Sequence, residues 1–173
     1  IHESFAHPTS MFLRNLMAMD TEEMIRAQPM DAVVLIGGCD KNMPGGMMGM
    51  LRANVPAIYV YGGTILPGHY QGKDLNIVSV FEAVGQHAAG NMSDAELEIL
   101  ERVACPSAGA CGGHYTANTM ACVSEAIGLA LMNSSGAPAP YESRDQYGLA
   151  SGEAVMNLIE KNIRARDVVT RKA

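Results

Sequence analysis

The sequence predicts an α/β fold, a layered structure in which a mainly parallel sheet is flanked by helices. Residues 32–36 and 55–61 are short apolar runs rich in β-branched and aromatic side chains, and a Gly-Gly pair follows each of them. Runs of this length without polar alternation are typical of strands buried on both faces, as in parallel sheets. Residues 45–52, between the two runs, suit a short helix, which completes a strand–loop–helix–strand unit.

The composition supports a folded chain and restricts its partners. Of the 173 residues, 48% are hydrophobic and 17% are charged, against about 25% charged in typical domains. A chain with this balance buries a sizeable core, which excludes wholesale disorder. The net charge is −6 and no basic run occurs, so we expect no nucleic-acid partner.

One helix is expected before the first strand, and two turns after the second. Asp20 or Thr21 can cap the helix, the acidic residues that follow suit its first turn, and Pro29 ends it. Turns are expected at residues 67–69 and 72–74, where Pro, Gly and polar residues gather.

The second half of the chain is predicted to be mainly helical. Its expected helices cover residues 78–89, residues 94–104 and residues 115–132, and a last helix opens near Ser143. Ser93 and Glu96 form a capping box, a sequence signature of a helix N-terminus. The residues between the second and third of these helices form a loop rich in glycine.

No segment is predicted to cross a membrane. The longest stretches without charged residues, 53–72 and 103–124, are broken by Pro, Gly or polar residues. The N-terminus has no basic region followed by an apolar run, so no secretory signal is recognised. The four cysteines form no paired zinc pattern, which favours reduced thiols. We expect a cytoplasmic protein, or one of an organelle stroma or matrix in a eukaryote.

Cys39, Asp40 and Lys41 follow the first predicted strand, at the end where parallel sheets bind ligands. Thiolates suit iron or zinc and carboxylates suit magnesium or manganese, so one loop could serve two metals. Lys41 as an ammonium has no lone pair, so it can be a ligand only when neutral or as a carbamate. The alternative is a buried Cys39 beside a surface pair of Asp40 and Lys41.

The glycine loop, residues 105–113, is the second candidate site. Its small residues let backbone N–H groups approach an anion or a cluster sulfur, and the next helix points its positive end toward it. The alternative is a tight loop between packed helices. Cys105 stays open between both roles, and Cys122 is expected in the core. The loop residues His69 and His114 could contact substrate, although a solvated side chain is the default for His69.

Two long runs carry a family resemblance. The first is CDKNMPG at residues 39–45, with Gly49 after it, and the second is residues 105–120, which end in YTANTM. Both runs resemble the signatures of the dihydroxy-acid and phosphogluconate dehydratase family. The resemblance is strong over residues 31–132 and weaker in the flanks.

Other stretches bear on the branch of that family. Residues 61–64, 72–74 and 78–85 resemble the dihydroxy-acid branch more than the phosphogluconate branch, whereas residues 14–31 look closer to relatives that act on sugar acids. The resemblance implies a branched-chain dihydroxy acid as the substrate, in branched-chain amino-acid biosynthesis. A sugar-acid (aldonate) dehydratase is the alternative within the family, and a non-catalytic fragment is the alternative outside enzymes.

The resemblance also implies a role for each site residue. Cys39 and Cys111 would ligate an iron–sulfur cluster, 2Fe–2S in preference to 4Fe–4S. Asp40 would bind magnesium, and Lys41 would do so as a carbamate. In the family reaction a 2,3-dihydroxy acid loses water to give a 2-keto acid, with an iron acting on the leaving hydroxyl and magnesium on the carboxylate and 2-hydroxyl. The full-length protein is expected to be a homodimer.

The sequence departs from the family pattern in three ways. The family uses a third cluster cysteine and another metal-binding Asp upstream, and residues 1–38 supply neither. Its catalytic serine and a further carboxylate lie in a C-terminal domain, so we expect the base outside this chain. His114 stands where relatives usually have Met. Residues 1–173 are therefore expected to be an internal part of the N-terminal cluster-binding domain, without the C-terminal domain.

Overall fold

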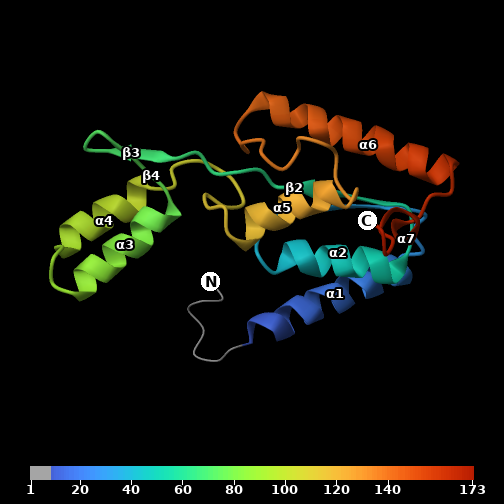
Figure 1. Ribbon diagram of the computed structural model, residues 1–173, viewed down its shortest axis with the longest axis horizontal. Helices are drawn as coiled ribbons and strands as arrows, with labels where there is room; N and C mark the ends of the chain where they lie inside the picture. The colour runs from blue at the N-terminus through green and yellow to red at the C-terminus, as the bar shows by residue number, and fades with distance from the viewer. Residues whose placement is uncertain (1–8) are drawn as a thin grey trace.

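The computed structural model describes residues 9–173 and has a parallel pair of strands at its centre (Figure 1). Strand β1 (Val33–Gly37) pairs with strand β2 (Ala57–Tyr61). The register places Gly37 opposite Tyr61, so both strands end at the same edge. The structure confirms the predicted α/β fold and the parallel pairing of the two apolar runs.

Helices pack on both sides of the strand pair. The described helices are, in chain order, α1 (Ser10–Ala27), α2 (Asn42–Ala53), α3 (Ile77–Ala88), α4 (Asp94–Val103), α5 (Thr116–Ala126), the 3-10 helix η2 (Glu142–Arg144), α6 (Asp145–Glu160) and α7 (Ala165–Val168). α2 connects β1 to β2 and packs against α1 and α5, while α6 packs against β2. Figure 1 shows α6 above the strands and α2 with α1 below them.

The core lies between α2 and the strand pair, and methionines fill much of it. Met43, Met47 and Met50 are each at most 4% exposed, and they pack with Tyr59 of β2. A Cβ added to Gly49 would lie 2.6 Å from a side chain of α1. The close packing of α1 on α2 therefore depends on the absence of a side chain at Gly49.

An arm, residues 68–103, extends from these layers. It consists of an antiparallel hairpin, β3 (Gly68–Tyr70) with β4 (Lys73–Leu75), and of the helix pair α3 and α4 (Figure 1). The predicted capping box at the start of α4 is confirmed, because the Ser93 hydroxyl oxygen accepts from the Glu96 N–H at 3.3 Å.

The strands differ from prediction in two respects. The turn expected at residues 67–69 falls mostly on strand β3, and the turn expected at residues 72–74 lies earlier, at residues 71–72 between β3 and β4. These three-residue strands are too short to show a sequence period. β1 was expected to be buried on both faces, but Val34 and Ile36 are 40% and 73% exposed. Val34 and Ile36 alternate along the strand and so share one face of β1, and the described part of the chain leaves that face largely uncovered.

Two helices differ from prediction in their bounds. α1 begins at Ser10, before the start expected near Asp20, because the Met-rich residues ahead of Asp20 contain no helix breaker. α5 ends at Ala126, and Gly128 with a φ of 80° then turns the chain, so the predicted helix was too long. Nowhere in residues 9–173 does a helix combine the length and apolar character needed to span a membrane.

Candidate functional site

Three segments meet at the edge where β1 and β2 end. They are the cysteine turn (residues 38–41), the segment after β2 (residues 62–65) and the glycine loop (residues 105–113). The Gly62 N–H donates to the Gly37 carbonyl at 2.8 Å, and the Ala110 N–H donates to the Gly63 carbonyl at 2.8 Å. These backbone bonds hold the glycine loop at the carboxyl ends of the strands, where parallel sheets bind ligands.

Cys39 and Cys111 lie on two of these adjacent segments. A Cβ added to Gly38 would lie 2.1 Å from the Cβ of Ala110, so the two segments pack this closely only because residue 38 is a glycine. The next residues along each segment are Cys39, which is exposed, and Cys111, which is partly exposed, and both are free thiols. The structure thus brings together the two segments that carry the predicted cluster ligands.

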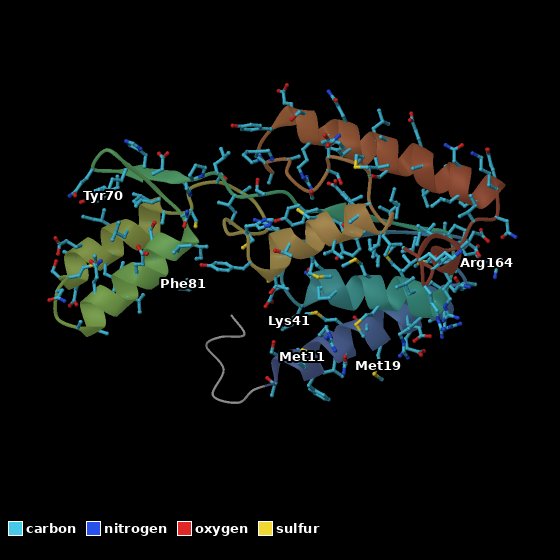
Figure 2. The ribbon with its side chains drawn as sticks, in the orientation of Figure 1. Met11, Met19, Lys41, Tyr70, Phe81 and Arg164 are labelled. Carbon is cyan, nitrogen blue, oxygen red and sulfur yellow. The ribbon has the colours of Figure 1, made fainter. Side chains whose placement is uncertain are left out.

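The cysteine turn is organised by Asn42, the first residue of α2. Its Oδ1 accepts hydrogen bonds from the N–H groups of Gly38 and Cys39, at 3.0 and 2.8 Å. Lys41 Nζ lies 2.6 Å from Asp40 Oδ2, and Cys39 Sγ lies 3.9 Å from Asp40 Oδ1. The carboxylate therefore lies between a thiol and an amine, at the end of α2 where Figure 2 labels Lys41.

The Asp40–Lys41 ion pair fits a magnesium site only after a change of charge. The two side chains are 22% and 13% exposed, so the pair is largely shielded from water. A carboxylate oxygen suits magnesium, but an ammonium 2.6 Å away neutralises it and offers no lone pair. A neutral amine or a carbamate at Lys41 would instead add a second donor beside the Asp40 carboxylate.

The Cys111 sulfur is hydrogen-bonded within its own loop. The Gly113 N–H donates to Cys111 Sγ at 3.4 Å, and the Gly113 carbonyl accepts from Asn118 Nδ2 at 2.7 Å. The Tyr61 hydroxyl in turn donates to Asn118 Oδ1. Burial, and then the nearby thiols led by Cys111, raise the pKa of the Tyr61 hydroxyl, which therefore stays protonated. A thiol with an N–H donor suits a cluster ligand, because such bonds stabilise a thiolate.

The other two cysteines have different surroundings. Cys122 was expected in the core, but it is exposed on α5, with its thiol 3.6 Å from the Ser135 hydroxyl. The core-facing side of α5 carries Ala121 and Ser124, and Cys122 is rotated about 100° from Ala121. Cys105 is partly buried in the glycine loop, where burial and then the neighbouring Cys111 raise the pKa of its thiol.

The loop histidines do not complete a metal site. His69 Nδ1 lies 3.1 Å from Asp74 Oδ1 in the hairpin of the arm, and His114 is exposed just before α5. Within the part of the chain that the structure describes, no three His, Cys, Asp or Glu side chains gather around a common point. The donors at the strand ends, two thiols with a carboxylate and an amine, therefore fit parts of a cluster site and of a magnesium site.

Three residues of the site were missed by the sequence reasoning. Asn42 could have been found as a polar residue at the first position of a helix. Asn118, 8% exposed in α5, was visible only as a polar residue within an apolar run. Tyr61 was assigned to a buried strand, and no sequence pattern indicated that its hydroxyl points to Asn118.

Comparison with known proteins matches residues 2–173 to the family described as dihydroxy-acid/6-phosphogluconate dehydratase N-terminal. The curated relatives include proteins named dihydroxy-acid dehydratase from Dinoroseobacter shibae, 66% identical over 165 residues, and from Parvibaculum lavamentivorans, 64% identical over the same length. Another, from Pelagibacter ubique, is 62% identical. Each alignment covers 95% of this chain and 29% of the relative, so the chain spans under a third of those proteins.

Proposed function

The chain belongs to the dihydroxy-acid/6-phosphogluconate dehydratase N-terminal family, and we propose that it forms the cluster-binding part of a hydro-lyase that converts 2,3-dihydroxy acids to 2-keto acids. The names of the relatives support the reaction and the substrate class. The observation that carries the proposal is the contact between Gly38 and Ala110, which brings the segments of Cys39 and Cys111 together at the strand ends.

Cys39 and Cys111 are the proposed cluster ligands, with 2Fe–2S as the proposed cluster type. Thiolates are the usual protein ligands of cluster iron, and both thiols are free and reach solvent. The contact of Gly38 with Ala110 holds the two segments together, and the Gly113 N–H already points at the Cys111 sulfur. The remaining ligands would come from other parts of the parent protein.

Asp40 and Lys41 are the proposed magnesium ligands, with Lys41 as a carbamate. Carbamate formation replaces a positive charge by a negative one, so the Asp40 carboxylate gains an anionic oxygen partner in place of an ammonium. Asp40 and a carbamate at Lys41 would offer two neighbouring oxygen donors, the ligand type that a hard divalent cation prefers, on side chains that are 22% and 13% exposed.

The residues of this chain position the reactants, and the metals supply the acid chemistry. When bound, the cluster and the magnesium ion supply Lewis acidity to substrate oxygens. Asp40 and Lys41 would hold the ion that binds the substrate's carboxylate end, and Cys39 and Cys111 would hold the cluster. Tyr61 cannot take the C2 proton, because its hydroxyl is buried and already protonated. The base is proposed to lie outside this chain.

The same proposal extends to the whole parent protein. We place it in branched-chain amino-acid biosynthesis, as a cytoplasmic homodimer or its organellar counterpart. The names of the relatives support a dihydroxy acid as substrate, and the choice between its branched-chain forms rests on the sequence resemblance.

The experiment uses the full-length parent protein, purified and reconstituted anaerobically with iron, sulfide and magnesium. Formation of 2-keto acid is measured with a branched-chain 2,3-dihydroxy acid and, in parallel, with an aldonic acid. We expect faster turnover of the branched-chain substrate. Preferential turnover of the aldonic acid would assign the protein to the sugar-acid branch, and a protein without iron or turnover would contradict the proposal.

A further inference from the structure

A chain of hydrogen bonds runs from the end of β2 to the Cys111 sulfur. The Tyr61 hydroxyl donates to Asn118 Oδ1, Asn118 Nδ2 donates to the Gly113 carbonyl at 2.7 Å, and the Gly113 N–H donates to Cys111 Sγ at 3.4 Å. Tyr61 and Asn118 are 2% and 8% exposed, so water does not readily replace these bonds. This series of hydrogen bonds links β2 to α5 and α5 to the glycine loop.

The chemistry of the groups fixes the direction of every bond in this chain. A backbone carbonyl can only accept, so the Gly113 oxygen must face the Nδ2 group of Asn118. The Oδ1 atom of Asn118 then faces Tyr61, whose hydroxyl must donate. Burial and the surrounding thiols keep that hydroxyl protonated and therefore able to donate. The orientation of the Asn118 amide is thus set by Tyr61 on one side and by Gly113 on the other.

We propose that Tyr61 is a positioning residue which, through Asn118, holds the Gly113 N–H on the Cys111 sulfur and so sets the electron density of that sulfur. The inference rests on the proposed role of Cys111 as a cluster ligand. Hydrogen bonds to cluster sulfurs, like the groups that orient metal ligands, tune the reduction potential and stability of the cluster. Tyr61 acts at a distance, because its hydroxyl contacts the Asn118 amide and not the sulfur.

β2 carries a matched control for this role. Tyr59 and Tyr61 are both 2% exposed, lie two residues apart and each donate one phenolic hydrogen bond. The Tyr59 hydroxyl ends on the Asn42 carbonyl at 3.2 Å, away from the glycine loop. Tyr59→Phe and Tyr61→Phe therefore remove the same phenolic hydroxyl from equally buried sites. Only Tyr61→Phe interrupts the series of hydrogen bonds that leads to Cys111.

The first test measures amide hydrogen exchange in the cluster-free, full-length protein. Tyr61→Phe should speed exchange of the peptide that contains Gly113 by about tenfold, the effect of losing one buried hydrogen bond. Tyr59→Phe should leave exchange of this peptide unchanged, although both variants lose thermal stability. Unchanged exchange at Gly113 in Tyr61→Phe would overturn the proposal, whether or not the protein binds iron.

The second test measures the reduction potential of the reconstituted holoenzyme. Tyr61→Phe should make the potential more negative at unchanged iron content, because a sulfur without its N–H donor is more electron-rich. Asn118→Leu should give the same shift, and the double variant should add nothing further, since both residues act through one chain. An unchanged potential in Tyr61→Phe, or additive shifts in the double variant, would overturn the proposal. A protein that holds no iron would refute the proposed function, while Gly113 exchange would still decide the role of Tyr61.

Discussion

Gly38 and Ala110 touch at the carboxyl end of the strand pair, and a Cβ at residue 38 would lie 2.1 Å from the Cβ of Ala110. The contact joins segments that are far apart in the sequence, the cysteine turn after β1 and the glycine loop before α5. Cys39 and Cys111 each follow one of the two contacting residues. The candidate site therefore depends on a glycine that is neither a ligand nor part of a turn with positive φ.

Gly38→Ala should separate the two segments and lower the iron content of the reconstituted full-length protein. Overpacking of this kind costs about 1–3 kcal/mol, and the strain falls on the segments that carry the proposed ligands. Iron per protein chain and the thermal midpoint are measured together.

Gly85→Ala is the matched control for that change. Gly85 lies in α3 with no neighbouring atom within 4 Å of an added Cβ, so the variant should gain about 0.5–1 kcal/mol of stability and keep its iron. Normal iron binding in Gly38→Ala would show that the close contact is not needed for the site.

Asp40→Asn should weaken the dependence on magnesium without changing the visible spectrum of the cluster. The substitution removes a hard anionic donor and leaves the thiols of the neighbouring segments in place. Activity is measured against magnesium concentration, and absorbance in the visible range is recorded on the same samples. A variant that loses the cluster spectrum would mean that Asp40 supports the cluster and not a separate magnesium ion.

Lys41→Arg should abolish activity, because a guanidinium keeps its charge and cannot form a carbamate. The variant keeps a positive charge beside Asp40, so a loss of activity would not be explained by loss of the ion pair. Lys73→Arg, at an exposed position of β4, is the control and should keep full activity. An active Lys41→Arg enzyme would rule out Lys41 as a carbamylated ligand.

The fold was predictable where local sequence patterns decide it. The two apolar runs indicated a parallel strand pair, and the capping box at Ser93 marked the start of α4, because both depend on residues close in the chain. The exposure of Ile36 was not predictable, since it depends on which elements lie beside β1. The hairpin of the arm was missed because three-residue strands carry no period.

The proposed ligands of the candidate site could be predicted from the sequence, but the residues that hydrogen-bond around them could not. Cys39 and Cys111 stand out as cysteines in glycine-rich loops, and the family signatures include both. Cys122 was assigned to the core because the sequence of an apolar helix does not show which side faces the core. Successive residues of a helix are rotated by about 100°, and this rotation takes Cys122 away from the side that carries Ala121. The bond from Tyr61 to Asn118 joins two elements through a side-chain geometry that no sequence spacing encodes.

The most direct test of the central claim compares iron content in Cys39→Ser, Cys111→Ser and Cys122→Ser variants of the full-length protein. All three replace a thiol by a hydroxyl, and Cys39 and Cys122 are both exposed, so exposure alone does not separate them. Cys39→Ser and Cys111→Ser should lose iron, the visible spectrum and activity, whereas Cys122→Ser should keep all three. Loss of iron in Cys122→Ser alone, with iron retained in Cys39→Ser and Cys111→Ser, would contradict the proposed site.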